Sequence, residues 1–355
     1  MVPSARRDPE ALAIAVLFGL LLVAGPLLLD SFRLNLMGKY MAFAFVAVGI
    51  VLTWGYGGML SLGQGIFFGM GGYMMAMFLK LEASAPELPD FMVWSSVEAL
   101  PLWWEPFRSA AFTLAALLVG PAVSAFTFSY LIFRKRVGGV YFAIVTLALA
   151  MTMTVISIGQ QGQTGGANGI TDFQTLLGLD ILSPQSKTVI YLVETVVLGA
   201  VMAVAWFIVR SRFGKVLIAI RDREDRVRFS GYDTALFKAF VFTVAAVFSS
   251  IGGAFYSLQV GLITPGLVGV VASIEMVIYA AVGGRLSIAG AVVGALLIGF
   301  LKSYLSETFP EAWLYFLGSV FILVVVAMPD GLAGLIDRSL RRKEKAPAPT
   351  PEPAR

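Results

Sequence analysis

Cysteine and histidine are both absent from this chain of 355 residues. Their absence excludes thiol nucleophiles, disulfide bonds, histidine bases, and the cysteine and histidine ligands of zinc and haem. Charged residues make up only 14% of the chain, whereas soluble domains have about a quarter. The phosphate-binding motif GxxxxGK[ST] is missing as well, so the sequence offers no ATP site of that kind.

Apolar residues are abundant, at 58% of the chain, and they are arranged in long uncharged segments. A helix needs about 20 apolar residues to cross a membrane. We therefore predict an all-α polytopic integral membrane protein with about ten transmembrane or partly spanning helices, the first of them uncleaved. The segments are approximately 11–29, 40–54, 64–80, 109–133, 139–158, 188–209, 236–260, 271–283, 287–303 and 312–328. The two segments around residue 285 are short enough to be half-membrane helices.

The charges between these segments predict how the chain is oriented. Basic residues gather at 134–136, at 210–228 and at 338–345, whereas 82–105 and 159–186 contain no lysine or arginine. Because basic loops stay in the cytoplasm, ten crossings with both termini cytoplasmic satisfy every loop. We expect a bacterial inner-membrane protein with a membrane domain at 1–336. Residues 337–355 would form a basic and then proline-rich cytoplasmic tail.

Two glycine-containing segments resemble each other. The sequence Gly-Gly-Met-Leu-Ser-Leu at 57–62 is matched by Gly-Gly-Arg-Leu-Ser-Ile at 283–288, and each precedes a glycine-rich apolar segment. Transporters are often built from internal repeats whose broken helices lie near the substrate pathway. Chance similarity is the alternative, because these residue types are common in this chain.

The segment 211–231 predicts an amphipathic helix outside the membrane. Phe213, Val216, Leu217 and Ile220 recur at helical spacing, and acids and bases occupy the other positions. Such a helix can lie on the membrane surface, or it can dock into a groove of a partner protein. The mixture of both charge signs favours the partner.

This segment resembles the cytoplasmic coupling loop of ABC importer permeases of the branched-chain amino-acid and urea type. The similarity extends over about 38–336, and includes the sequence WGYGGMLSLGQG at 54–65 and Gly-Gly-Arg at 283–285. The resemblance implies partners: two ABC ATPase subunits, a second homologous permease and an external solute-binding protein, within membrane lipid. It also implies that the ATPases are contacted by Phe213, Gly214, Ala219, Ile220, Arg221, Asp222 and Glu224.

Within the family, the external segments are most similar to the urea permeases. The sequences LPDFM at 88–92, PLWWEPF at 101–107 and GGANGITDF at 165–173 carry this similarity. The late motif departs from the family pattern, because leucine follows Gly-Gly-Arg where another glycine is expected. Urea is therefore the expected solute, with branched-chain amino acids or short amides as the alternative. The acidic stretch 82–105 is a plausible docking surface for the binding protein, or simply a solvated loop.

Five residues are candidates for the substrate pathway: Ser61, Gln64, Asn168, Thr171 and Glu275. Ser61 and Gln64 could hydrogen-bond a solute, or satisfy backbone groups freed by a helix break. Asn168 and Thr171 lie in a glycine-rich loop where turn residues are normal. We expect Glu275 to be the only acid well inside a span, which marks a functional position, unless its depth places it near the outer surface.

Two other classes of protein compete with an ABC permease. A self-sufficient secondary transporter or channel should carry several ionisable residues inside its spans, and a membrane enzyme needs a constellation of catalytic groups. Neither pattern is apparent, so we expect a transport subunit that is not an enzyme. No cofactor, metal site or nucleic-acid partner is expected.

Overall fold

The structure is a computed structural model that describes residues 9–327 and 330–335. Within these residues eight helices are long and apolar enough to cross a membrane, which confirms the polytopic all-α prediction. They are α1–α2 (Pro9–Leu28), α3 with a terminal π-turn η2 (Ser31–Tyr56), α4 (Gln64–Ser84), α6 (Ala110–Arg134), α7 (Val140–Gly159), α9 (Pro184–Arg210), α11 (Thr234–Val260) and α13 (Ile288–Thr308). Two further helices are shorter, α12 (Val270–Gly283) and α14 (Trp313–Ala327). The tail predicted at 337–355 lies outside the described residues.

Short elements connect the long helices. They are α5 (Asp90–Trp94), η3 (Glu105–Arg108), α8 (Gln161–Thr164), η4 (Gly166–Asn168), α10 (Arg212–Phe229), η5 (Pro265–Leu267) and the two-residue strands β1 (Ile170–Thr171), β2 (Thr175–Leu176), β3 (Leu179–Asp180) and β4 (Leu262–Ile263). Strand β1 pairs antiparallel with β4, and β2 with β3. The β1–β4 pair joins the loop after α7 to the loop after α11.

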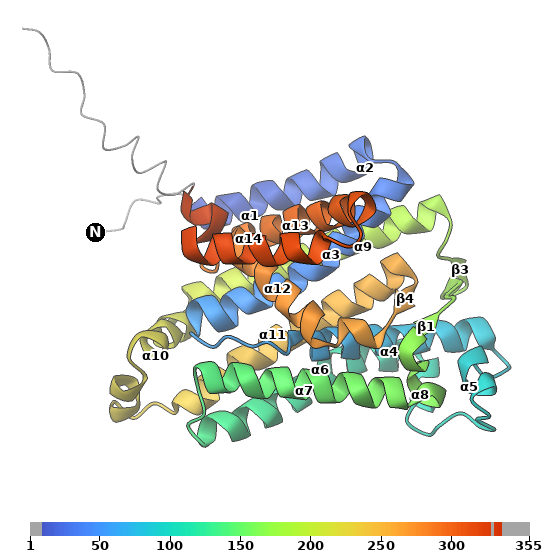
Figure 1. The fold of residues 1–355 in the computed structure, drawn as a ribbon, viewed down its shortest axis with the longest axis horizontal. Helices are drawn as coiled ribbons and strands as arrows, with labels where there is room; N and C mark the ends of the chain where they lie inside the picture. The colour runs from blue at the N-terminus through green and yellow to red at the C-terminus, as the bar shows by residue number, and fades with distance from the viewer. Residues whose placement is uncertain (1–8, 328–329, 336–355) are drawn as a thin grey trace, which may run out of the picture.

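The helices lie roughly side by side (Figure 1), and the loops at the two ends of the bundle differ in charge. We call the end that carries α10 and Arg134–Arg136 the basic end. The opposite end, the acidic end, carries α5, α8 and the short strands. The structure therefore places the basic loops 134–136 and 210–228 at one end of the bundle. The loops without lysine or arginine, 82–105 and 159–186, lie at the other end.

Two predicted segments are longer in the structure than apolarity indicated. The second span begins at Ser31, where the Asp30 carboxylate caps the helix by accepting a hydrogen bond from the Arg33 amide. Because Arg33 and Lys39 lie in its first turns, the apolar run shows only from residue 40. The segment at 287–303 is a full-length helix, since Ser287 caps it by accepting from the Gly290 amide at 2.9 Å and the helix continues to Thr308.

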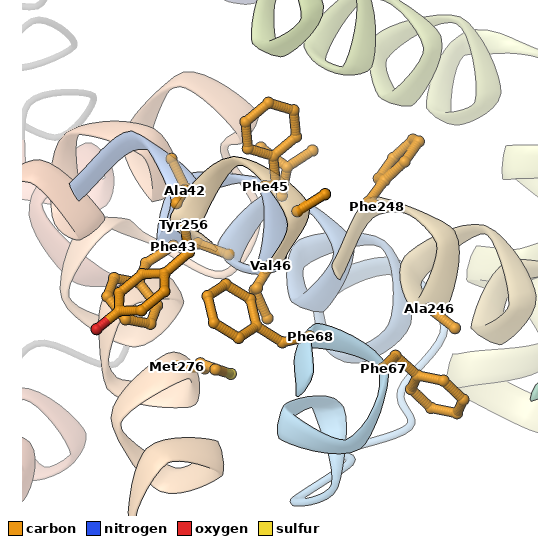
Figure 2. Packing of buried hydrophobic residues seen from close by; sticks show 14 of the residues in the cluster. Ala42, Phe43, Phe45, Val46, Phe67, Phe68, Ala246, Phe248, Tyr256 and Met276 are labelled. Atoms are coloured by element: carbon orange, nitrogen blue, oxygen red, sulfur yellow. The ribbon is translucent and has the colours of Figure 1, made fainter. Parts of the chain in front are cut away.

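Helices α3, α4 and α11 form the centre of the bundle, and small residues bring their backbones together. A Cβ at Gly253 of α11 would overlap the Phe68 carbonyl, and one at Gly71 of α4 would overlap the Ser250 carbonyl. Such contacts are the usual means of close helix association in lipid. Figure 2 shows the aromatic rings that fill the space beside them, among which Phe43 stacks on Phe68 at 5.1 Å between ring centroids.

Helix α12 begins inside the bundle rather than at its surface. The segment that follows α11 turns inward along α4, so that Ile263 lies against Gly72 and Val268 against Gly69. The Ser273 hydroxyl then accepts a hydrogen bond from the Gly65 amide at 3.1 Å. With 14 residues at 1.5 Å of rise per residue, α12 spans about 21 Å. Its length is below that of a complete crossing, whereas that of α13, the other segment expected to be short, is not.

Candidate functional site

The break between α3 and α4 is held by polar side chains from three other helices. The Leu62 amide donates to the Thr146 hydroxyl of α7 at 3.0 Å, and the Ser249 hydroxyl of α11 donates to Gln64 Oε1 at 3.1 Å. Ser273 of α12 holds the Gly65 amide, as described above. Backbone groups freed by a break in lipid must find partners. The Leu62 and Gly65 amides find theirs in the hydroxyl groups of Thr146 and Ser273.

The two predicted pathway residues at this break lie close together and are buried. The Ser61 hydroxyl accepts from the Gly63 amide at 3.3 Å, so it serves the break itself. Gln64 is fully buried, and its Nε2 has no hydrogen-bond partner among the described residues. An unsatisfied buried amide costs about 1–3 kcal/mol. Gln64 thus keeps an unused donor in the middle of the protein.

The second glycine segment lies directly against the first. The Tyr56 hydroxyl donates to the Leu286 carbonyl at 2.8 Å, and the Arg285 guanidinium lies 5.9 Å from the centre of the Trp54 ring. A Cβ at Gly55 would overlap the Arg285 carbonyl. The similarity between 57–62 and 283–288 therefore corresponds to two helix breaks in direct contact.

The second glycine of each segment has the same backbone character. Gly58 has φ of 67° and Gly284 has φ of 123°, both in the region that side chains disfavour. Both segments end one helix and begin another.

Helix α10 is attached to the first break through Arg221. The guanidinium Nη1 donates to the Gly55 carbonyl at 2.6 Å, and its Nε pairs with the Asp222 carboxylate at 3.0 Å. A Cβ at Gly58 would lie 2.7 Å from Cγ of Arg221. Glycine is therefore required where the arginine crosses the loop. A displacement of α10 would be transmitted directly to this break.

The seven residues predicted to contact an ATPase divide into two groups. Phe213 stacks on Phe237 of α11 at 4.9 Å between centroids, and Gly214 lies against the carbonyls of Ile208 and Val209. Ile220 is buried as well. These three residues pack against other parts of the same chain. The exposed members are Ala219, Arg221 and Asp222, and Glu224 is half-buried.

Glu224 fixes the end of α10 to the start of α11. Its carboxylate accepts hydrogen bonds from Lys238, from the Thr234 hydroxyl at 3.0 Å and from Arg228 at 2.9 Å. Burial by itself would raise the pKa of the Glu224 carboxyl, but the hydrogen bond and charge of Lys238 outweigh that effect. Together with Thr234 and Arg228 they hold the pKa of Glu224 below its ordinary value.

The Glu275 carboxylate forms an ion pair with Lys302 of α13, with its two oxygens 2.7 and 2.8 Å from the lysine nitrogen. Glu275 is buried, and it follows Ser273, which bonds the first break, by two residues. Glu275 lies in the second turn of α12, whose start packs along α4 beside the first break. Lys39 of α3 lies near enough to interact electrostatically with both members of the pair.

The expectation that Glu275 is the only acid inside a span is wrong. Glu194 lies in the middle of α9 and is fully buried, and its Oε2 accepts from Gln259 Nε2 at 2.8 Å. Its Oε1 has no hydrogen-bond partner among the described residues. Glu194 is the only charged residue in the apolar segment 188–209, so the mean apolarity of that segment conceals it. A single acid in such a segment is itself the signal of a buried polar site.

Asn168 and Thr171 lie apart from the break, at the acidic end. Asn168 is exposed in the short turn η4, and Thr171 belongs to β1, where its hydroxyl donates to the Asp172 carboxylate at 2.8 Å. Thr171 also pairs with Leu262 in β4, which leads toward α12. The structure therefore brings Ser61 and Gln64 together and places Glu275 on the neighbouring helix. It does not bring Asn168 or Thr171 to them.

These features can be compared with known proteins. Residues 32–325 match the family described as branched-chain amino acid transport system, permease component. The chain belongs to this family. It is therefore a multi-pass permease of an ABC transporter in the bacterial inner membrane, and a transport component rather than an enzyme.

Individual relatives of the permease are distant. The high-affinity branched-chain amino acid transport system permease protein LivM of Escherichia coli K12 is 23% identical over 348 residues, covering 92% of this chain and 76% of LivM. The corresponding protein BraD of Pseudomonas aeruginosa is 22% identical over 297 residues, covering 82% and 91%. The ribose import permease protein RbsC of Haemophilus influenzae is 23% identical over 310 residues, covering 85% of each chain. No solved structure matches.

Several polar residues that organise the permease were not found from the sequence. Ser249 and Ser273 both hold the first break, and Lys80 pairs with Asp90 at 2.9 Å. Serine and threonine are common in apolar helices, where they also bond their own backbone. Their position in the sequence therefore gives no sign of which ones reach another helix.

Proposed function

We propose that the permease forms the translocation pathway for urea in an ABC importer. Both termini lie in the cytoplasm, which places the basic end in the cytoplasm and the acidic end outside. ATP is hydrolysed by two separate ATPase subunits. A second homologous permease completes the pathway, and an external solute-binding protein delivers the solute.

The observation that carries the choice of solute is the set of uncharged polar groups around the first break. Gln64 lies between Ser249 and the Gly65–Ser273 hydrogen bond, and its Nε2 is a buried donor with no hydrogen-bond partner among the described residues. Urea is planar and neutral, with four N–H donors and one carbonyl acceptor. A chain of hydroxyl and amide groups suits such a solute, because these groups exchange hydrogen bonds with it without a charge.

Two ion pairs of the bundle support the same choice. Glu275 is matched by Lys302, and Lys80 is matched by Asp90, whereas the buried Glu194 is bonded by the Gln259 side-chain amide. A zwitterionic amino acid needs charged or dipolar groups for its carboxylate and its ammonium. These ion pairs are already formed within the chain and would have to be broken to serve it.

The relatives favour the alternative solute, a branched-chain amino acid, over urea. LivM and BraD are named for branched-chain amino acids, whereas RbsC, which is named for ribose, has 23% identity over a shorter stretch of 310 residues. Similarity of this degree therefore extends over solutes of different chemistry. A permease for branched-chain amino acids or short amides is the alternative. A self-sufficient secondary transporter is the less favoured alternative. Transport by the purified chain alone in liposomes, without any ATPase, would support it.

Surfaces at both ends suit the proposed partners. At the basic end, Ala219 and Asp222 are exposed on α10, where an ATPase groove could receive them. At the acidic end, Glu87, Glu98 and Glu105 are exposed and open to a binding protein. Glu82 is not part of that surface, because its carboxylate accepts from the Leu177 and Gly178 amides at 3.0 and 2.7 Å and so holds the β2–β3 turn.

The test is uptake of radiolabelled urea and leucine at micromolar concentration, in cells with and without the gene. We expect loss of the gene to abolish urea uptake only, and the wild-type gene to restore it. Loss of leucine uptake alone would show that the permease carries leucine and not urea, with its family assignment unchanged. Loss of neither would reject both solutes.

A variant of the break makes the test specific. Gln64→Leu removes the free amide at similar size, and we expect it to reduce urea uptake while the protein still reaches the membrane. Gln185→Leu makes the same change at an exposed position, and it should have no effect. Equal uptake by both variants would remove Gln64 from the pathway.

A further inference from the structure

A polar pocket of about 280 Å³ lies at the basic end, between the α6–α7 corner and the α10–α11 corner. Two corners that are distant in sequence form its walls. Its lining includes Tyr130, Arg134, Arg136, Arg228, Tyr232 and Asp233. Figure 1 shows both corners at the same end of the bundle. No residue of the glycine breaks and none of the seven predicted ATPase contacts lines the pocket, but Arg228 in its wall bonds Glu224, which is one of those contacts.

The pocket carries unmatched positive charge. Arg228 is neutralised by Glu224 and Asp225, at 2.9 and 3.8 Å. Neither Arg134 nor Arg136 forms an ion pair with any residue that the structure describes. Arg134 lies over the Tyr130 ring at 5.9 Å from its centroid, and Arg136 has φ of 63°, which non-glycine residues rarely adopt.

The acid that lines the pocket does not balance these arginines. The Asp233 carboxylate accepts hydrogen bonds from the Ala235 and Leu236 amides at 3.0 and 3.3 Å, so it is engaged in capping α11. Two guanidinium groups therefore remain to bind an anion. Arginine is well suited to phosphate, because it presents its donors in a planar fork.

An exposed apolar strip on α6 leads directly to this pocket. Val119, Val123 and Phe126 follow one another at helical spacing, and all are exposed. Phe126 stacks on Tyr130 at 5.7 Å between centroids, and Tyr130 is followed one turn later by Arg134. Aromatic and basic residues at the end of an apolar helix face mark the boundary between hydrocarbon and headgroups.

We propose that this pocket binds the phosphate of an anionic phospholipid, whose acyl chain lies along the α6 strip. Basic pockets between membrane helices on the cytoplasmic side are typical sites for anionic headgroups. A soluble phosphate would have no use for the apolar strip, which is why a lipid fits better. Because Arg228 also bonds Glu224, the bound lipid would stabilise the corner that ends α10.

The test measures which lipids remain bound to the purified full-length permease in nanodiscs made of phosphatidylcholine and phosphatidylglycerol. Native mass spectrometry reports the bound lipid. We expect enrichment of phosphatidylglycerol, and loss of that enrichment in Arg134→Gln/Arg136→Gln. A basic residue near an anionic surface contributes roughly a factor of five in binding, so the double variant should lose about twenty-five-fold.

The control removes the same charge outside the pocket. Lys135→Gln/Lys215→Gln changes two exposed lysines at the basic end, and it should retain the enrichment. Equal loss in both double variants would overturn the proposal in favour of a general surface charge, as would no enrichment in the wild type. Displacement of the lipid by millimolar inorganic phosphate would overturn the lipid as the source of the anion.

A partner protein is the remaining alternative, and the assembled transporter distinguishes it. We expect the enriched lipid to persist when the ATPase subunits are bound. Its absence from the assembled complex would show that an acidic segment of a partner occupies the pocket. Lipid binding is measured without any solute, so its failure does not bear on urea transport, and failure of urea uptake does not bear on the pocket.

Discussion

The Arg221 guanidinium of α10 donates a hydrogen bond of 2.6 Å to the carbonyl of Gly55, in the π-turn that ends α3. Gly55 in turn lies against the Arg285 carbonyl at the start of the second break. Arg221 thus connects α10 to the end of α3, and Gly55 connects that end to the loop before α13.

Replacing Arg221 by alanine should uncouple transport from ATP hydrolysis. The change removes a hydrogen bond from a charged donor, which contributes about 1.5–3 kcal/mol. We expect solute uptake to fall roughly tenfold or more, since about 1.4 kcal/mol corresponds to a factor of ten. ATP hydrolysis by the assembled transporter should continue. Uptake and hydrolysis measured on the same proteoliposomes provide the check.

The control is Arg226→Ala, which removes an exposed arginine from the same helix. It should leave both rates near those of the wild type. If Arg221→Ala also transports normally, the contact with Gly55 carries no motion. If it lowers hydrolysis and uptake equally, Arg221 belongs to the ATPase contact instead.

Replacing Gly55 by alanine should destabilise the junction of the two breaks. The added Cβ would overlap the Arg285 carbonyl, so one backbone segment has to move. Overpacking of this kind costs about 1–3 kcal/mol. We expect a lower melting temperature of the detergent-solubilised permease. Gly138→Ala introduces the same methyl group into open space, and an equal loss of stability there would contradict the prediction.

The ion pair between Glu275 and Lys302 should appear as a coupling energy in a double-mutant cycle. Glu275→Gln and Lys302→Met each remove one charge of the pair, and the double variant removes both charges. Because Glu275 is buried and Lys302 is one-third exposed, we expect a coupling of about 2 kcal/mol, between surface and buried pairs. Unfolding of the four proteins in detergent measures it. Strictly additive losses would show that the pair does not join α12 to α13.

Stability should depend on pH through Glu224, whose pKa is lowered in the folded protein. A carboxyl with a lowered pKa stabilises the fold fully above its unfolded pKa, and the contribution is lost as pH falls through the folded value. The advantage of the wild type over Glu224→Gln should therefore be complete at neutral pH. It should shrink as the pH falls below 4.5, the ordinary pKa of a glutamate side chain.

Melting temperatures of both proteins over a range of pH test this dependence. Asp225→Asn is the matched control, because its carboxylate is largely exposed and lies 3.8 Å from Arg228. It should show little difference from the wild type at any pH. A difference between wild type and Glu224→Gln that is the same at acidic and neutral pH would contradict the prediction.

Apolarity along the chain predicted each of the ten helical segments, because lipid requires long uncharged helices whatever their neighbours are. The starts of helices were less predictable. Ser31 begins the second span ahead of Lys39, whose charge interrupts the apolar run and lies near the carboxylate of Glu275. The short length of α12 was predicted from the apolar run at 271–283, but its position in the bundle depends on how the preceding loop packs on α4.

The residues of the candidate site were predicted in part. Glycine and serine at 57–62 marked the first break, and Gln64 stands at its end. The break had to be seen in three dimensions to show that Thr146, Ser249 and Ser273 hold it, since these come from three other helices. Glu194 was missed entirely.

Composition and order of residues determine by themselves that this protein spans the membrane many times, which ends of its helices are basic, and which family it belongs to. These properties depend on local apolarity and charge, which each segment carries independently of the others. The tertiary structure alone decided that the two glycine segments touch and that Arg221 reaches Gly55. It also decided that two distant corners enclose a basic pocket. Such contacts depend on helix packing between residues far apart in the chain, and no single segment records them.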